Sequence, residues 1–169
     1  MKKERIRCRF GRLAVVVGAL GLGALLAPSA ALAAPGGTGH TVSITETVHG
    51  TFTDPGATNP CTGALGTASF DGNAVTHLTF FPGGAEYWFT FTETGKVTVT
   101  WAGVTYTGHA TVWANGNWNE KNSNFTFTLT VRLFAPDGSS VVGHQVSHLA
   151  LNANGVVTVS FDKLSFTCT

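Results

Sequence analysis

The sequence predicts an all-β protein: an up-and-down antiparallel meander of eight or nine strands, with no substantial helix after residue 33. Three observations support this fold class. Threonine, valine, phenylalanine and glycine dominate the chain after that point, a composition typical of strands joined by glycine turns. Apolar and polar residues alternate with a period of two, most strictly from Asn124 to Phe134. Beyond residue 33, no stretch combines helical apolar spacing with a capping signal.

The first 33 residues have the features of a secretory signal peptide. Six Lys or Arg and one acid precede an apolar run from Leu13 to Ala27, and Ala31-Leu32-Ala33 forms an A-x-A cleavage site. A retained membrane anchor is the less favoured interpretation, because the run is shorter than the ~20 residues of a spanning helix. We therefore expect cleavage after Ala33, a flexible mature N-terminus over 34–40 and a single domain over 41–169.

Removal of the leader changes the charge balance of the chain. Six of the ten Lys and Arg and one of the nine acids lie in the leader, which leaves four basic and eight acidic residues and a net charge of −4, against +1 for the whole chain. Binding to nucleic acid or to an anionic membrane depends on clustered Lys and Arg, so neither partner is expected. We expect a secreted, extracellular monomer that uses no cofactor.

Cys61 and Cys168 are the two cysteines of the mature chain, and an even pair in an exported protein indicates a disulfide. Cys61 comes just after the first expected strand and Cys168 follows the last. A bond between them would bring the two ends of the meander together, as closure of a barrel requires. Since an open sheet of this size leaves unpaired edges, the sequence favours a closed β-barrel over a two-sheet sandwich.

Turn residues divide the mature chain into the expected strands. The first seven run over about 41–53, 64–70, 74–81, 85–92, 96–101, 104–114 and 124–134, and two more follow Pro136-Asp137-Gly138 and Asn152–Gly155. Asp71-Gly72-Asn73 and Glu93-Thr94-Gly95 are interpreted as hairpin turns, and Asp54-Pro55-Gly56 is expected to end the first strand. The apolar phase shifts at Ala102-Gly103, which we interpret as a tight turn in preference to a bulge.

The stretch from His144 to Asp162 is the clearest hairpin. Pro136-Asp137-Gly138 and Ala153-Asn154-Gly155 both suit three-residue loops with glycine in the left-handed region. That geometry pairs Leu133 with Val141, Phe125 with Leu149, Leu149 with Val159 and Leu151 with Val157. One face then carries Phe125, Phe127, Leu129, Val131, Leu133, Leu149, Leu151, Val157, Val159 and Phe161; the other carries Thr126, Thr128, Thr130, Arg132, His144, His148, Thr158, Ser160 and Asp162. A two-residue Asn154-Gly155 turn would instead place His148 beside Phe161.

Aromatic residues are the best candidates for a functional site. The chain has four Trp, two Tyr and twelve Phe, for which core packing is the simpler explanation. A small barrel can also hold one small ligand among its inward side chains. We therefore expect an apolar or aromatic ligand to contact residues from several strands: Tyr87, Phe89, Phe91, Trp101, Tyr106 and Phe127.

Three histidines, His109, His144 and His148, form a candidate polar site. His144 and His148 are about 13 Å apart along a strand at ~3.3 Å per residue, too far to bind one metal ion, so no metal site is expected. Exposed or cross-strand-paired histidines are the simpler interpretation. Catalytic residues are not assigned, because the sequence has no nucleophile elbow, calcium loop or phosphate-binding glycine loop.

The sequence favours a binding protein over an enzyme. Two further function classes stay open. A cofactor-free enzyme of the cyclase or isomerase kind needs an inward ionisable residue; His77, Glu46 and Glu93 are in phase with apolar neighbours. An extracellular protein that binds carbohydrate or the cell envelope would use outward tryptophans. For this role we place Trp113 on the outer face and Trp118 in a loop.

The C-terminal half carries a series of short motifs: Thr105-Tyr106-Thr107-Gly108-His109, Thr111-Val112-Trp113, Phe125-Thr126-Phe127, His144 with His148, Asn152-Ala153-Asn154-Gly155, Thr158-Val159, Phe161-Asp162-Lys163 and Cys168. These resemble a family of small secreted actinobacterial proteins of unknown function, closely over Thr105 to Cys168 and loosely before it. The outline is similar to calycin (lipocalin-like) and to allene oxide cyclase or dirigent barrels. That likeness concerns the fold alone and implies no catalytic residue.

Overall fold

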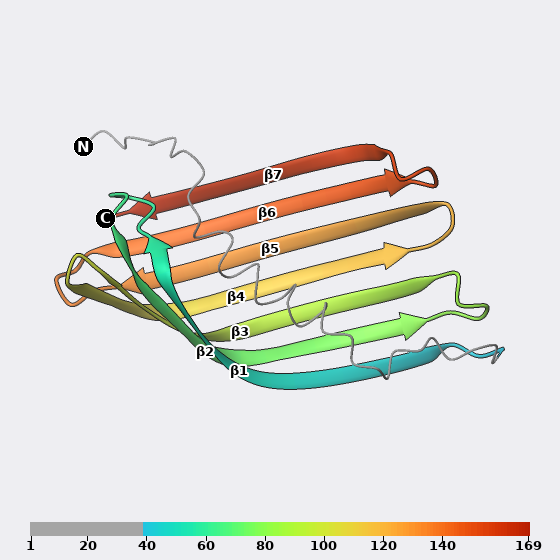
Figure 1. Ribbon diagram of the computed structural model, residues 1–169, viewed down its shortest axis with the longest axis horizontal. Coiled ribbons are helices and arrows are strands. Elements are labelled where there is room, and N and C mark those ends of the chain that lie inside the picture. Colours follow the sequence, from blue (N-terminus) through green and yellow to red (C-terminus); the bar gives the residue numbers. More distant parts are fainter. Residues whose placement is uncertain (1–38) are drawn as a thin grey trace.

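The computed structural model describes residues 39–169, which form one antiparallel sheet (Figure 1). Seven strands follow one another in sequence and in space: β1 (Val42–Thr58), β2 (Leu65–Phe80), β3 (Tyr87–Trp101), β4 (Val104–Trp118), β5 (Asn122–Phe134), β6 (Ser140–Asn152) and β7 (Val157–Cys168). The all-β class and the meander are confirmed. Residues 39–169 include no helix long and apolar enough to cross a membrane. The predicted signal peptide, 1–33, and most of the predicted mature N-terminus, 34–40, lie outside the described residues.

The strands number seven instead of eight or nine, because two expected turns lie inside long strands. Asp71-Gly72-Asn73 is part of β2 and Glu93-Thr94-Gly95 is part of β3, where Gly72 pairs with Gly95. The ring of Phe70 packs over both glycines: a Cβ added to Gly95 would lie 2.6 Å from Cζ of Phe70 and 2.7 Å from Cα of Gly72. The glycines therefore make room for an aromatic ring on the sheet, and the chain does not reverse there.

Three of the other hairpin turns have the predicted chemistry. Ala102 and Gly103, with φ of 49° and 82°, form a two-residue turn between paired Trp101 and Val104. The two three-residue loops are closed by backbone hydrogen bonds from Ala135 to Ser139 (2.9 Å) and from Asn152 to Val156 (3.0 Å). Their glycines, Gly138 and Gly155, have φ of 87° and 72°, the left-handed conformation that the prediction requires.

A β-bulge at the start of β7 makes the predicted register of the last hairpin wrong. Leu151 pairs with Val157 as expected, but Ala150 pairs with Val159, so Thr158 is an extra residue and Leu149 faces Ser160. An extra residue moves every later side chain to the opposite face. The outer face therefore gains Val159 and Phe161, and the inner face gains Ser160 and Asp162. His148 does lie beside Phe161, with ring centroids 5.8 Å apart, through this bulge and not through a two-residue turn.

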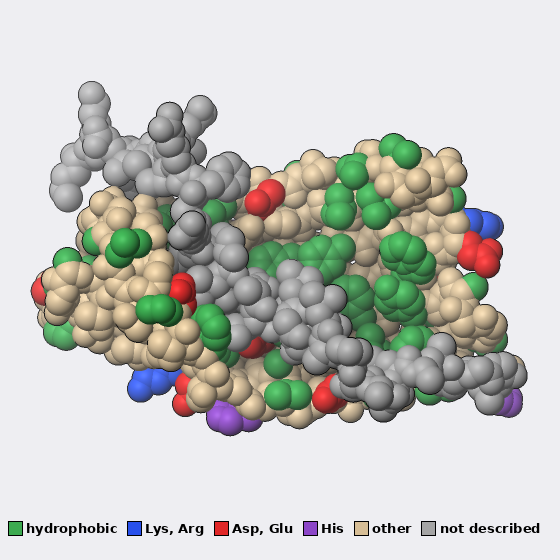
Figure 2. Space-filling model, in the orientation of Figure 1, with side chains coloured by type: hydrophobic (Ala, Val, Ile, Leu, Met, Phe, Trp, Pro, Cys, Tyr) green, Lys and Arg blue, Asp and Glu red, His purple; other side chains and the backbone are tan. Residues whose placement is uncertain are grey.

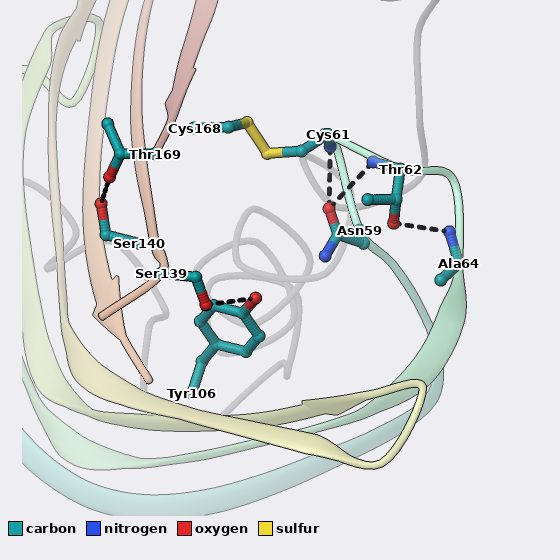
Figure 3. Close-up of a disulfide and its surroundings, with 9 residues drawn as sticks. All are labelled: Asn59, Cys61, Thr62, Ala64, Tyr106, Ser139, Ser140, Cys168 and Thr169. Carbon is teal, nitrogen blue, oxygen red and sulfur yellow. Dashed lines mark hydrogen bonds between the residues drawn. A yellow bond between two sulfur atoms is a disulfide. The ribbon is translucent and has the colours of Figure 1, made fainter. Parts of the chain in front are cut away.

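The sheet is strongly curved, and a disulfide joins its two edge strands at one end. Cys61, in the β1–β2 loop, bonds to Cys168 at the end of β7, with Cα atoms 6.2 Å apart (Figure 3). Asn59 Oδ1 accepts hydrogen bonds from the backbone N–H groups of Cys61 (2.8 Å) and Thr62 (3.2 Å), which fixes the loop that presents Cys61. Toward this loop β1 continues through a bulge at Asp54-Pro55-Gly56, where the sequence predicts that it ends.

The described strands do not form a closed barrel. Each strand pairs with its neighbours in sequence, and within residues 39–169 no pairing joins β1 to β7. The closed barrel is therefore not confirmed, and the architecture is a cup whose edges are tied covalently at one end. We call the end with the disulfide the closed half. The open half is the end with the β2–β3, β4–β5 and β6–β7 loops.

The core covers the concave face of the closed half. Its buried residues come from six strands: Ala57, Phe70, Val97, Val99, Trp101, Ala110, Val131, Leu133 and Val141. Trp101 Nε1 donates a hydrogen bond to the backbone oxygen of Ala57 (3.1 Å), which anchors the end of β1 over the sheet. A smaller cluster of Phe91, Val112, Ala114 and Leu129 continues toward the open half. The closed half is well filled and holds an apolar cavity of about 40 Å³.

Candidate functional site

The concave face of the open half leaves large apolar side chains accessible. In antiparallel pairing, directly opposed residues share a face, so the pairs define inward rows across the sheet. One such row contains Ile44, Leu78, Phe89, Gly116, Phe125, Leu149 and Ser160. Ile44 and Leu149 are each 37% exposed although they face the inside of the cup. Figure 2 shows hydrophobic side chains gathered over the middle of this face, with Lys, Arg and His near its margins.

A hollow of about 210 Å³ lies at the outer end of this face. Its lining comes from four neighbouring strands, β3 to β6: Tyr87, Phe89, Asn117, Trp118, Ser123, Asn124, Phe125, Leu149 and Leu151. Phe89 and Phe125 stack with ring centroids 6.1 Å apart. Gly116 lies between them in the register, and a Cβ there would meet the Phe89 ring at 2.6 Å. A dry cavity of ~150 Å³ holds one benzene molecule, so this hollow has room for an aromatic group.

Two buried polar side chains mark the inner end of the open half. Glu93 is 7% exposed and Gln145 is 9% exposed, and they lie in one inward row with Val112 and Leu129 between them. Glu93 Oε2 and Gln145 Oε1 have no hydrogen-bond partner among the described residues. A buried polar atom left unpaired costs about 1–3 kcal/mol, so these two oxygens are acceptors that a ligand could satisfy.

The side-chain amide of Gln145 is held in one orientation. Its Nε2 donates a hydrogen bond to Oδ1 of Asp162 (2.9 Å), and the hydroxyl of Ser147 donates to the same oxygen (2.7 Å). Because an ionised carboxylate only accepts, the NH₂ group must face Asp162 and the carbonyl oxygen must face away from it. Asp162 reaches this face because of the bulge at Thr158. The bulge therefore sets which atom of Gln145 is presented inside the cup.

Burial raises the pKa of Glu93 above its ordinary value of 4.5, because loss of water disfavours the charged carboxylate. A carboxyl group in such a site ionises more readily when a cation or a hydrogen-bond donor approaches it. Inward ionisable groups with a perturbed pKa are common at binding and catalytic sites, and equally occur as structural groups. Here the perturbed group also has an unpaired oxygen and lies beside an accessible apolar surface.

Charges are segregated between the two faces of the sheet. In the open half, the inward positions of the strands carry three carboxylates, those of Glu46, Glu93 and Asp162. The basic residues and histidines of β1–β7 all occupy outward positions: His49, His77, Lys96, His109, Arg132, His144, His148 and Lys163. The concave face of the open half is therefore both apolar and negative.

The six aromatic residues predicted to bind a ligand are divided between the two halves. Tyr87 and Phe89 line the hollow, and Phe91 and Phe127 belong to the cluster next to it. Trp101 is 2% exposed and packs edge-on against Tyr106 in the closed half, with ring centroids 5.3 Å apart. The hydroxyl of Tyr106 accepts a hydrogen bond from Ser139 (2.9 Å; Figure 3). Trp101 and Tyr106 are thus positioned as core residues.

The three histidines of the candidate polar site lie on the convex face and are not brought together. His148 Nδ1 is 2.8 Å from Thr126 Oγ1, His144 Nδ1 is 3.2 Å from Thr130 Oγ1, and exposed His109 pairs with Lys96 and Arg132 in the register. Among residues 39–169, no three His, Cys, Asp or Glu side chains are grouped so that they could hold a metal.

The inward ionisable residues that the enzyme alternative requires are also separated by the structure. His77 lies on the convex face, where its Nδ1 is 2.8 Å from Thr45 Oγ1. Glu46 faces inward on β1 but is exposed. Glu93 alone of these three is both inward and buried.

Sequence reasoning missed Gln145, Ser147 and most of the lining of the hollow. Gln145 and Ser147 alternate in phase with Val141, Leu149 and Leu151, so the period of two could have placed them on the inner face. Trp118 ends β4 and lines the hollow, whereas the sequence places it in a loop.

No protein-family model, curated protein or solved structure matches this chain. The resemblance of Thr105–Cys168 to secreted actinobacterial proteins therefore stays a prediction. Function is therefore inferred from the concave face of the open half.

Proposed function

We propose that this is a secreted binding protein that holds a small apolar or aromatic ligand on the concave face of its open half. The hollow of about 210 Å³ is the observation that carries the proposal. Its lining is mostly aromatic and aliphatic, and Trp118 and Leu149 remain 51% and 37% exposed although they face into the cup. Accessible apolar surface in a concavity, with a few polar groups nearby, is the usual character of a small-molecule site.

The disulfide supports this proposal because it stabilises one half of the sheet and leaves the other half open for binding. The closed half carries the larger core and the covalent tie between β1 and β7. The open half has no covalent tie between those strands, so its inner surface stays accessible from one end. In this proposal the protein works as a barrel that is closed at the disulfide and open at the ligand end, with the rigidity that a binding site needs.

Isothermal titration calorimetry with 4-phenylbutan-1-ol, a neutral molecule with an apolar body, tests the proposal. The wild-type protein should bind it, and Trp118→Ala should weaken binding about tenfold, since removal of a large aromatic contact costs about 1.4 kcal/mol or more. Trp113→Ala is the matched control, because Trp113 is similarly exposed at 40% but faces outward. Absence of binding to the folded wild-type protein would contradict the proposal, as would equal effects of the two variants.

A cofactor-free enzyme of the cyclase or isomerase kind is the second candidate, and buried Glu93 is the observation that favours it. An inward acid whose pKa is raised by burial can exchange a proton with a bound molecule. The two candidates differ in what the protein retains. Native mass spectrometry of the secreted wild-type protein and of Glu93→Gln should show the same bound compound for a binding protein, and two compounds related by reaction for an enzyme.

A further inference from the structure

We propose that the ligand of this face is a hydrophobic amine: an organic cation with an apolar body, whose ammonium group is bound by Glu93, with Gln145 as a further acceptor in the same inward row. This inference rests on the proposed function and adds the chemistry of the ligand's polar end. Three independent features of the concave face support it: the kind of hydrogen-bonding atoms it presents, the sign of its charges, and the arrangement of its aromatic rings.

The unpaired polar atoms at the inner end of the open half are both acceptors when Glu93 is ionised. Glu93 Oε2 is a carboxyl oxygen, and Gln145 Oε1 is a carbonyl oxygen whose orientation is fixed by the hydrogen bond from Nε2 to Asp162. A ligand that satisfies them must supply donors. An ammonium group has three donors and no acceptor, whereas a carboxylate has acceptors alone and would leave both oxygens unpaired.

The charges of the face favour the same class of ligand. Glu46, Glu93 and Asp162 point inward in the open half, and no Lys, Arg or His of β1–β7 occupies an inward position. Charges interact more strongly where water is partly excluded, so an organic cation is attracted to this surface and an organic anion is repelled. The binding of an ammonium group also favours the charged form of Glu93, which burial alone opposes.

Aromatic side chains connect the acceptors to the hollow. Moving outward from the row of Glu93 and Gln145, the next inward row carries Phe91 and Phe127 on either side of Ala114. The following row carries Phe89 and Phe125, which line the hollow. The row of Phe89 and Phe125 is four residues along the strands from the row of Glu93 and Gln145, a distance of about 13 Å at ~3.3 Å per residue. A ligand with its ammonium group at the acceptors therefore lays its apolar body along aromatic rings, which also attract cations.

Calorimetry with three probes of one shape tests the inference: 4-phenylbutylamine, 4-phenylbutan-1-ol and 4-phenylbutanoate, each near neutral pH. The amine should bind at least tenfold more tightly than the alcohol, and the carboxylate should bind most weakly. Glu93→Gln should reduce the preference for amine over alcohol to less than threefold and change the affinity for the alcohol little. Gln145→Leu, which keeps the apolar volume, should weaken amine binding more than alcohol binding.

A convex-face variant provides the matched control. Asp71→Asn removes an exposed carboxylate on the outer face, near His49 (3.4 Å), and should leave amine binding unchanged. Circular dichroism verifies that each variant is folded. Equal binding of all three probes would overturn the amine inference and leave the proposed function standing. An amine preference that survives in folded Glu93→Gln would overturn the assigned residues, and failure of all three probes to bind would overturn both proposals.

Discussion

Gln145 on β6 donates its side-chain Nε2 to Oδ1 of Asp162 on β7 across 2.9 Å, and Ser147 donates to the same carboxylate oxygen. The hydrogen bond is diagonal, because Asp162 pairs in the register with Ser147 and Gln145 pairs with Leu164. It joins a buried amide to an exposed carboxylate at the edge of the sheet. The Nε2 group of Gln145 is thus hydrogen-bonded to Asp162, while its carbonyl oxygen has no partner among the described residues.

Asp162→Ala should lower the free energy of unfolding by about 1–2 kcal/mol, because the buried amide of Gln145 loses its charged partner. Urea unfolding of the two proteins measures this difference. Asp71→Ala, which removes an exposed carboxylate from the convex face, should change stability by less than about 0.5 kcal/mol. If the two alanine variants were equally stable, the hydrogen bond between Gln145 and Asp162 would have no structural importance.

The disulfide should make a large contribution to stability. Cys61 and Cys168 are 107 residues apart, and a cross-link over that span stabilises by about 4–5 kcal/mol in the chain-entropy description. The double variant Cys61→Ser, Cys168→Ser should melt well below the wild type in calorimetry. A reductant should lower the melting temperature of the wild type toward that of the variant and leave the variant unchanged. A wild type insensitive to reductant would contradict this expectation.

Two glycines of one inward row should respond differently to the same substitution. Gly95→Ala places a Cβ against Phe70 and Gly72 and should destabilise by about 1–3 kcal/mol through overpacking. Gly50→Ala is the control: a Cβ there meets nothing within 4 Å. It should be neutral within about 0.5 kcal/mol. Denaturant unfolding compares the two, and a neutral Gly95→Ala would mean that the Phe70 ring moves aside without cost.

Glu93 should give the stability of the protein a defined pH dependence. Its pKa in the folded state is raised above 4.5, its ordinary value, which we assign to the unfolded chain. Between these two pKa values the folded protein binds the proton more tightly, so the free energy of unfolding falls as the pH rises through that window. Glu93→Gln should therefore melt at a higher temperature than the wild type near pH 7, and this difference in melting temperature should disappear below pH 4.5.

Thermal melts of wild type and Glu93→Gln across that range provide the measurement. Glu86→Gln, outside the strands and near Trp88, serves as a control for the loss of one negative charge. An advantage for Glu93→Gln that grew on acidification would contradict the raised pKa.

The turns show how far local sequence determines this fold. Pro136-Asp137-Gly138 and Ala153-Asn154-Gly155 were predicted in detail, because left-handed glycine after a type I turn is a local requirement. Gly72 and Gly95 were misinterpreted as turn residues for a non-local reason. Their function is to accommodate the ring of Phe70, and each becomes necessary only once β2 and β3 are paired.

The candidate site was partly predictable for a related reason. Glu93 could be placed on the inner face from its phase with Phe91 and Val97, and the structure agrees. Asp162 could not, because Val157-Thr158-Val159 alternates equally well with or without an extra residue, and the bulge reverses the faces after it. The phase of Gln145 with Val141 and Leu149 places it on the inner face, but the sequence gives no sign that its carbonyl oxygen stays unpaired there.

Carboxylates lie inside the cup, whereas Lys96, Arg132 and Lys163 lie outside it, so the two faces of the curved sheet differ in the sign of their charge. A charge distribution of this kind acts on an approaching ion before any contact forms. Added salt shortens the range of such fields to about 10 Å at 0.1 M. The rate at which an organic cation associates with this protein should therefore fall as ionic strength rises, while its dissociation, governed by contacts within the cup, should change little.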